Sequence, residues 1–422
     1  MGTFTGVFTK KEWSWAFYDV ACSPFFSTVV TAFFPVFLKD YWSDSTVDST
    51  SYLAITSSVA ALVVALIAPL IGATADRAGL ARFWLLLFSL LAIICCFGLA
   101  FIGKGDYTSA LMVFALAVIG ANAANAIYDG LLTEVTSSSQ YHRLSLVGYA
   151  CGYLGGAVML SFNFLCTLHP QRFGLANEGE AVKLAFICVA VWWLIFMLPL
   201  LIHTKKRSQT DISIKKAIAE GCSSLWNTAK HIRSQKPVLM FLIAYWFYID
   251  GVGTVYRMAV DFGKHLEFKT PELFVAILLV QFISFPAALG FTYIAKYMGA
   301  KKGIYLGIAI YSCVSLGAAF IKTIQDFYIL AALVALAQGG LQSLSRSYFA
   351  LLIPKNKSGE YFGFYNAFGR FAAIIGPILM VFVKGITGSY RLSMVSILLL
   401  FILGAIFLSC IKDEQPKAKK AV

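Results

Sequence analysis

TKKRSQTDISIKKAIAEGCSSLWNTAKHIRSQK, from Thr204 to Lys236, is the only long polar run between the N-terminus and the C-terminal tail. Eight of its residues are Lys or Arg and only two are acidic. Each side of this stretch has about the same length of apolar chain, which we divide into six hydrophobic segments. We therefore predict two similar halves, residues 1–203 and 237–411, joined by a basic, water-facing linker at 204–236. A basic tail at 412–422 follows the second half.

Composition indicates a membrane protein. Hydrophobic residues make up 59% of the 422 residues and charged residues only 13%, whereas a soluble domain is about one-quarter charged. Apolar stretches of about 20 residues recur, and each can cross a hydrocarbon core as a helix. These runs are continuous rather than alternating, which disfavours a β-barrel. The predicted fold class is an all-α membrane protein with twelve transmembrane helices in two pseudo-symmetric bundles.

The first predicted span contains Asp19 and is too long for the core of a signal peptide, so we expect a retained helix. The twelve predicted spans are Trp13–Leu38 and residues 51–73, 83–103, 108–134, 143–168, 181–203, 237–261, 271–295, 303–321, 326–352, 360–386 and 390–411.

The distribution of basic residues predicts the orientation. If both termini are cytoplasmic, 22 of the 34 Lys and Arg residues fall in inner segments and 9 in outer ones. This agrees with the positive-inside rule. The basic charge would then face anionic lipid at the cytoplasmic surface. We therefore expect no nucleic-acid partner.

The two halves repeat each other in detail. Trp15-Ala-Phe-Tyr-Asp19 in the first span matches Trp246-Phe-Tyr-Ile-Asp250 in the seventh. Weak internal repeats of this kind are typical of secondary transporters, whose binding site lies near the membrane midplane.

The loop predicted between the second and third spans is Gly72-x3-Asp76-Arg77-x-Gly79-x2-Arg82. It resembles the signature loop of the major facilitator superfamily, in which this loop locks one conformation and releases the other. Negative charge on Asp76 is favourable near a neighbouring helix N-terminus. The resemblance implies a gating role for Asp76, Arg77 and Arg82, and the alternative is an ordinary polar turn.

A narrower resemblance covers nearly all spans. It is carried by Trp15–Ser23, Tyr128–Glu134, Gly148–Gly156, Phe247–Gly251, Gln338–Tyr348, Tyr361–Tyr365 and Gly376-Pro377. With these pieces the chain is similar to the family of unknown major facilitators that includes the autophagy-related vacuolar amino-acid effluxer of yeast. The resemblance implies efflux of small organic solutes, and the short loops suggest a member from a bacterial inner membrane. The fourth span departs from the family pattern at Gly130 and Thr133, near its inner end.

Glycines at 148, 152 and 156 fall on one face of the fifth span and permit close approach of another helix. The face is either a sliding seam between the halves or a static packing surface.

Charges within the spans are expensive unless they are paired or face water. Asp19, Asp129 and Arg346 each lie about 9 Å from the cytoplasmic end of their spans at ~1.5 Å per residue. We predict that they meet in an inner gate. The alternative for each charge is a fixed ion pair between helices.

Two further charges lie deeper. Arg370 is about 16 Å and Asp250 about 20 Å from the inner end of their spans. We predict that Arg370 holds the carboxylate of the cargo and Asp250 its amine, unless Arg370 is a fixed strut. The polar residues expected at cavity depth are Asn122, Asn125, Gln281, Gln338 and Gln342.

The predicted function is a secondary transporter of a small organic solute, most simply an amino acid or related zwitterion, working by alternating access. A proton is the expected coupling ion, because buried carboxyls can titrate. The alternatives are a carrier of an amphiphile such as a lysolipid, and a non-transporting receptor or scaffold. The sequence has no Gly-rich phosphate loop ending in Lys-Ser/Thr, no Gly-x-Ser-x-Gly and no His-Glu-x-x-His. We therefore expect that the protein is not an enzyme and has no catalytic residue, cofactor or metal. We also expect a monomer.

Overall fold

The computed structural model describes residues 8–43, 48–203, 225, 227–372 and 375–411. Most of the predicted linker and the whole predicted tail therefore lie outside the described residues. The last part of the linker, residues 227–234, is helical.

The first half contains six spans. Their elements are α1 (Lys10–Pro24), continued by η1 (Phe25–Phe33), α2 (Phe34–Phe37) and η2 (Leu38–Trp42); α3 (Ser49–Ala78); α4 (Ala81–Leu99); α5 (Tyr107–Val135); η3 (Ser138–Gln140) with α6 (Tyr141–Leu168); η4 (Pro170–Phe173); and α7 (Glu178–His203).

The second half repeats this pattern. Its elements are α9 (Lys236–His265); α10 (Thr270–Met298); α11 (Ala300–Gly317) with η5 (Ala318–Phe320); α12 (Ile324–Leu352); η6 (Lys355–Lys357) with α13 (Ser358–Phe371) and α14 (Ile375–Thr387); and α15 (Tyr390–Ser396) with α16 (Leu398–Ser409).

The described residues contain twelve helical stretches that are long and apolar enough to cross a membrane, which confirms the predicted number. Their outward surfaces expose large apolar side chains, for example Met112 and Val381, which are 64% and 71% exposed. Such a surface suits lipid rather than water. Two spans differ from the prediction in shape: the first extends to Trp42, and the eleventh consists of the separate helices α13 and α14.

The first span changes its winding after Pro24. Proline has no backbone N–H, so it cannot continue the normal hydrogen-bond ladder. From Phe25 to Phe33 the chain adopts a π-helix, a winding that is frequent at functional sites. This wide segment contributes Phe26, Ser27 and Thr31 to the cavity described below.

Equivalent turns end corresponding helices in the two halves. Gly79, with φ of +65°, terminates α3, and Gly299, with φ of +87°, terminates α10. Side chains with a Cβ rarely adopt such angles, so glycine is favoured at both turns. The repeat read from the sequence is therefore also a structural repeat.

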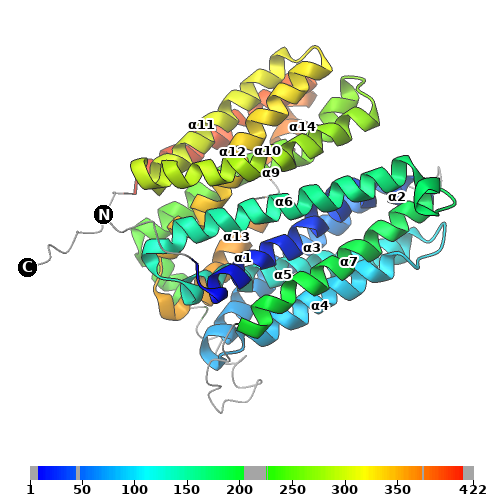
Figure 1. Cartoon of the computed structure of the whole chain (residues 1–422). Coiled ribbons are helices and arrows are strands. Elements are labelled where there is room, and N and C mark those ends of the chain that lie inside the picture. Colours follow the sequence, from blue (N-terminus) through cyan, green and yellow to red (C-terminus); the bar gives the residue numbers. More distant parts are fainter. Residues whose placement is uncertain (1–7, 44–47, 204–224, 226, 373–374, 412–422) are drawn as a thin grey trace, which may run out of the picture.

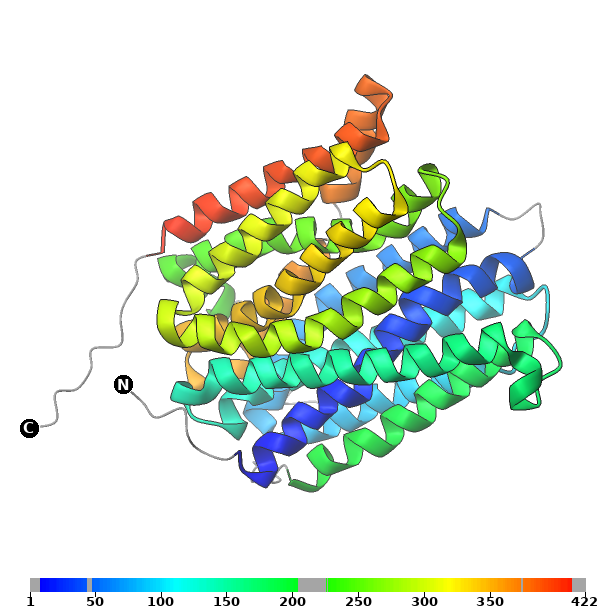
Figure 2. The same ribbon diagram turned by 45° about the horizontal axis from the view of Figure 1, so that its top comes forward.

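The two halves lie against each other along their length. Figure 1 shows α1 to α7 on one side and α9 to α12 with α14 on the other, and Figure 2 shows the same division. Between them, α6 packs against α10 and α12, and α13 packs against α3 and α5. We call the end of the bundle that carries His203 and Lys236 the linker end. Because successive spans alternate in direction, the turns after α3, α5, α10 and α12 lie there too.

Helices α3 and α13 cross with almost no side chain between them. A Cβ on Gly72 would collide with the carbonyl of Gly359, and one on Gly363 would lie 2.5 Å from Cα of Pro69. Gly130 of α5 approaches the same point, since its Cβ would lie 3.1 Å from Cα of Gly359. The unexpected glycine in the fourth span thus admits α13, and α5 continues as a helix to Val135.

Candidate transport site

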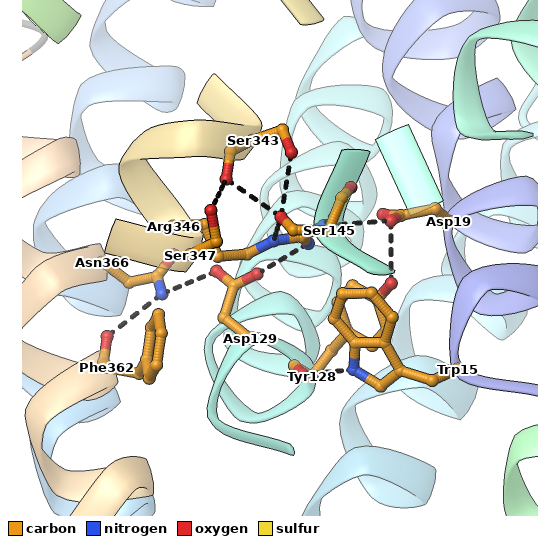
Figure 3. A network of polar contacts seen from close by, with 10 residues as sticks. All are labelled: Trp15, Asp19, Tyr128, Asp129, Ser145, Ser343, Arg346, Ser347, Phe362 and Asn366. Carbon is orange, nitrogen blue, oxygen red and sulfur yellow. Dashed lines mark hydrogen bonds and ion pairs between the residues drawn. The ribbon is translucent and has the colours of Figure 1, made fainter. Parts of the chain in front are cut away.

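A buried arginine joins the two halves near the linker end. Arg346 of α12 is 2% exposed. Its Nη1 lies 3.1 Å from Oδ1 of Asp129 on α5, and its Nη2 lies 3.4 Å from Oδ2 of Asp19 on α1. The side chain also donates to Ser145 of α6, from Nε to Oγ at 2.9 Å and from Nη2 to the carbonyl at 3.2 Å. Figure 3 shows one arginine of the second half surrounded by acceptors of the first.

Aromatic rings enclose the same guanidinium. Its Cζ lies 4.6 Å from the ring centre of Trp15, 4.4 Å from that of Tyr149 and 5.4 Å from that of Tyr128. Trp15 stacks on Tyr128, and the Tyr128 hydroxyl donates to Oδ2 of Asp19 at 2.7 Å. Cation–π contacts of this kind gain strength when water is excluded. The rings therefore fix both the arginine and the Asp19 carboxylate.

Further hydrogen bonds reinforce this junction. Asn366 of α13 donates to Oδ2 of Asp129 at 3.1 Å, and Ser343 of α12 donates to Oγ of Ser145 at 3.0 Å. His142 of α6 and Ser347 of α12 lie 2.8 Å apart. We call Arg346, Asp19, Asp129, Ser145 and their hydrogen-bond partners the Arg346 cluster. The structure brings together the three charged residues predicted for an inner gate.

Asp76 forms a second polar junction between the halves. Its Oδ1 accepts from N of Gly359 at 3.1 Å, and its Oδ2 accepts from N of Glu360 at 2.8 Å. These amides belong to the first turn of α13, so a carboxylate of the first half caps a helix of the second. The predicted contact with a neighbouring helix N-terminus is thus present.

The segment around Asp76 differs from the predicted loop. Gly72 to Ala78 continue helix α3, and the turn itself is confined to Gly79 and Leu80. Arg77 lies in the last turn of α3 and Arg82 in the first turn of α4. The helix persists because its end is held by the α13 crossing, a contact that loop propensity does not reveal.

A cavity of about 360 Å³ lies between the halves beside the Arg346 cluster. This volume suits a small ligand. Its polar lining residues are Asp19, Ser23, Ser27, Thr31, Asn125, Tyr128, Asp129, Tyr149, Tyr153, Tyr245, Tyr256, Arg257, Gln281, Gln338, Gln342, Arg346, Tyr365, Asn366 and Arg370.

Two arginines of this lining have no direct acidic partner. Neither Arg257 of α9 nor Arg370 of α13 forms an ion pair or a hydrogen bond with any described residue. Asn125 and Gln338 are similar, because Oδ1 of one and Oε1 of the other are buried without a hydrogen-bond partner in the described part of the chain. Buried polar groups are normally satisfied, so the two buried amide oxygens are unusual.

Sequence similarity assigns this chain to a known protein family. The model of the family described as vacuole effluxer Atg22 like matches residues 41–134 and 132–421. This chain belongs to that family. The MFS-type transporter YxiO of Bacillus subtilis (strain 168) is 34% identical over 414 residues, which cover 96% of each protein. Autophagy-related protein 22 of Yarrowia lipolytica is 27% identical over 292 residues, which cover 62% of this chain but only 48% of that protein.

A solved structure shows the same fold. The major facilitator superfamily proton:xylose symporter XylE superposes with a TM-score of 0.71 at 15% identity, over 96% of this chain and 95% of that one. The Atg22-like protein therefore has the major facilitator fold, as predicted, and is an integral membrane protein of the transporter class.

The predicted cargo residues have different positions in the Atg22-like protein. Arg370, Asn125, Gln338 and Gln342 line the cavity. Asn122 is only 3% exposed and is absent from the lining; its Oδ1 has no partner among the described residues. Asn122 and Asn125 are three residues apart, so they lie on the same side of α5 about one turn from each other. The lining from α5 begins at Asn125 and continues toward the linker end with Tyr128 and Asp129.

Asp250 differs most from its predicted role. It is 1% exposed and does not line the cavity. Its Oδ2 accepts from N of Gly376 at 2.9 Å, and its Oδ1 accepts from Oγ1 of Thr254 at 3.3 Å. Gly376 lies in the first described turn of α14, so the Asp250 carboxylate links α9 to this helix. The sequence does not show this contact, and depth alone leaves Asp250 available to a cargo.

The glycine face of α6 packs mainly within the first half. A Cβ on Gly148 would lie 2.5 Å from Oδ2 of Asp19, and one on Gly152 would lie 2.5 Å from Oγ of Ser23. Gly156 approaches the second half at Gln281 of α10, and a Cβ on Gly148 would also lie 3.5 Å from Nη2 of Arg346. The glycines therefore seat α1 and its carboxylate close to α6.

Several lining residues were not predicted as site residues. Arg257 and four tyrosines, at 149, 153, 245 and 256, form much of the cavity wall. A signal was available: Tyr149 and Tyr153 are four residues apart on α6, and Asp250 and Arg257 are seven apart on α9. Each spacing places both residues on one helix face.

Proposed function

We propose that this protein transports a small organic solute bearing a carboxylate, most simply an amino acid or related zwitterion, by alternating access of its two halves. The observation that carries the proposal is Arg370, a guanidinium in a cavity between the halves with no acidic partner among the described residues. A guanidinium binds a carboxylate through two parallel hydrogen bonds.

The acceptor atoms of the cavity support the same class of cargo. Oδ1 of Asn125 and Oε1 of Gln338 lack donors among the described residues. An ammonium group carries three N–H donors and no acceptor, so these two oxygens can receive it. In this proposal they take the place that Asp250 cannot fill.

The Arg346 cluster and Asp76 are proposed as the gate at the linker end. Both connect the halves through hydrogen bonds and ion pairs rather than covalent or broad apolar contact. Such contacts can be exchanged for water when the halves separate. In the opposite state the cavity would open toward the linker end.

Coupling to protons is part of the proposal. Asp19 and Asp129 line the cavity and also bind Arg346. When Arg346 leaves them, two neighbouring buried carboxylates would remain, and a shared proton relieves their repulsion. A pH gradient across proteoliposomes should therefore drive uptake, and equal uptake without the gradient would contradict coupling.

Orientation and environment complete the proposal. We propose a bacterial plasma membrane protein, monomeric, with both termini and the linker in the cytoplasm near anionic lipid, because 22 Lys and Arg residues fall on that side against 9 on the other. A reporter fused after Val422 should give a cytoplasmic signal, and a periplasmic signal would contradict this orientation.

The main test is binding to the purified protein. Arg370→Lys keeps the charge but loses the planar fork, so it should weaken binding of carboxylate solutes by about tenfold or more. Thermal shifts with a panel of amino acids would measure the effect. Arg172→Lys, at an exposed position of η4, is the matched control. Undiminished affinity in folded Arg370→Lys would rule out this anchor.

A second candidate has one observation in its favour. An apolar pocket of about 330 Å³ is lined by Trp246, Phe368, Phe371 and Ile375. It could hold the chain of an amphiphile such as a lysolipid. Lysolipid binding that is retained in Arg370→Lys and lost in Phe368→Ala would favour this candidate.

A further inference from the structure

The charges of the cavity wall are unequal. Its acidic residues are Asp19 and Asp129, and its basic residues are Arg257, Arg346 and Arg370. Both acids bind Arg346. The remaining wall therefore carries two cations and no anion of its own.

The side chain of Arg257 runs along its own helix α9, back toward Gly253. A Cβ on Gly253, one turn earlier, would lie 3.1 Å and 3.2 Å from its two terminal nitrogens. The guanidinium thus occupies the space that the missing side chain leaves. Glycine at 253 lets Arg257 lie along the wall rather than extend across the cavity.

The nearest acid, Asp250, does not neutralise Arg257 by direct contact. Its two oxygens accept from Gly376 N and Thr254 Oγ1, although the two charges attract each other. The Asp250 carboxylate is held at the N-terminus of α14, where it is also favoured by the helix dipole. Arg257 therefore keeps its donors for another partner.

Two stacked aromatic rings lie beside the backbone that carries Arg370. The hydroxyl of Tyr245 is 3.3 Å from the position of a Cβ on the adjacent Gly369, and Tyr245 stacks on Tyr365 with ring centres 4.1 Å apart. The charges of Arg370 and Arg257 act on each other, and charges of the same sign repel. Two cations that line one cavity within the membrane-spanning region favour a bound anion.

We propose that the cargo carries two carboxylates on a short aliphatic frame, one bound by Arg370 and the other by Arg257. This inference rests on the proposed transport function and narrows its cargo. A solute with one carboxylate leaves one arginine uncompensated, whereas a dicarboxylate compensates both. An amino group, if present, would bind Asn125 and Gln338, so that simple dicarboxylates and acidic amino acids share the site.

The test is a binding series on the purified full-length protein. Succinate, glutamate and leucine are the probes, titrated by calorimetry into wild type, Arg257→Gln, Arg370→Gln and the exposed control Arg172→Gln. Succinate or glutamate should bind wild type at least about tenfold more tightly than leucine. Glutamate binding tighter than succinate would assign the amino group to the site; the reverse would assign simple dicarboxylates.

The variants separate this inference from the function on which it rests. Arg257→Gln should remove the preference for the second carboxylate and leave leucine affinity within about threefold. Arg370→Gln should weaken all three probes. Equal binding of leucine and glutamate by wild type, or an unchanged preference in Arg257→Gln, would overturn the dicarboxylate inference while leaving Arg370 as an anchor.

A different outcome would overturn both proposals. If folded wild type binds none of the three carboxylates, neither the anchor nor the second arginine has the proposed role. Arg257→Lys guards against misfolding, because it keeps the charge and should retain a reduced preference for the dicarboxylate. The inference would also be contradicted if folded Arg257→Lys lost its preference for the dicarboxylate over leucine while Arg257→Gln kept that preference.

Discussion

Asp19 and Asp250 end the same aromatic motif in the two halves. Asp19 binds a residue of the other half, whereas Asp250 binds only residues of its own half. Asp19 accepts from Tyr128 of its own half and pairs with Arg346 of the other half. Asp250 accepts from Gly376 and Thr254, both in its own half. The repeat fixes where each carboxylate lies on its helix, while the neighbouring span decides what it binds.

This difference assigns the two carboxylates different tasks. The contact of Asp19 with Arg346 joins the halves, so a carrier that separates them must break it. The contact of Asp250 holds α14 within one half, so it can persist throughout. Breaking the two contacts should therefore have different consequences for stability and for movement.

Loss of Arg346 should have the largest effect. Arg346→Gln leaves the carboxylates of Asp19 and Asp129 buried without their cation, and such a loss costs about 3–5 kcal/mol. Chemical denaturation of the purified protein would measure the free energy of unfolding. The exposed variant Arg172→Gln should remain within about 0.5 kcal/mol of wild type. Equal stability of Arg346→Gln and wild type would show that the pair is not buried in the folded protein.

The next largest effects should come from an added methyl group beside each carboxylate. Each such variant should lower the free energy of unfolding by about 1–3 kcal/mol. A Cβ at Gly148 would lie 2.5 Å from Oδ2 of Asp19, and one at Gly376 would collide with Oγ1 of Thr254. Gly148→Ala should loosen the halves, whereas Gly376→Ala should lower stability alone, with partial rescue by Thr254→Ala. Thermal unfolding and hydrogen exchange of α12 measure these effects.

Gly290→Ala is the control for both glycine variants, since no atom lies within 4 Å of a Cβ added there. It should not destabilise the protein. If Gly376→Ala increased exchange in α12 as much as Gly148→Ala, the proposed confinement of the Asp250 contact to one half would be wrong.

Asparagine substitutions test charge with little change of shape. Asp250→Asn keeps an acceptor for the Gly376 amide but loses the charge at the α14 N-terminus, for a cost of about 1–2 kcal/mol. Hydrogen exchange should accelerate at the start of α14 and remain unchanged in α6. Asp19→Asn should give the reverse pattern. Identical exchange patterns for the two variants would remove the distinction between them.

The smallest effect is expected at Asp76. Its side chain caps α13, and Asp76→Asn should cost only about 0.3–1 kcal/mol of stability while changing the rate at which the linker end opens. Asp106→Asn is the matched control, because Asp106 caps α5 within the first half, by accepting from N of Ser109 at 3.1 Å. Transport rates in proteoliposomes should fall for Asp76→Asn only. Equal rates for both variants would reduce the Asp76 contact to a static cap.

The sequence predicts the fold well because membrane spans are long and continuous. The twelve spans can be read from hydrophobicity alone, and the repeat of Trp15–Asp19 at Trp246–Asp250 indicates the two similar halves. The contact between Asp19, Asp129 and Arg346 could also be predicted. Depth in the membrane follows from counting residues along each span, and the three residues have the same depth.

The remaining features depend on angles around helices and on breaks within them. Depth gives no information on where the cavity ends along a helix, so the sequence groups Asn122 with Asn125, although only Asn125 lines the cavity. Nor does it show that the eleventh span is divided between Phe371 and Ile375, which decides the partner of Asp250. The contribution of Arg257 was missed because it lies nearer the end opposite the linker end, although its neighbour Gly253 directs its guanidinium inward.

The crossing of α3 and α13 has an entropic consequence. A long side chain fixed in an interface loses up to ~1.5–2 kcal/mol of rotamer freedom, whereas glycine loses none from a side chain. The crossing brings Gly72 against Gly359 and Gly363 against Pro69, so joining the halves there freezes almost no side chain. The difference in free energy between joined and separated halves at this point then depends on the two hydrogen bonds of Asp76. Hydrogen bonds to a charged group contribute about 1.5–3 kcal/mol each, so the preference for the joined state at this crossing comes from the Asp76 carboxylate rather than from ordered side chains.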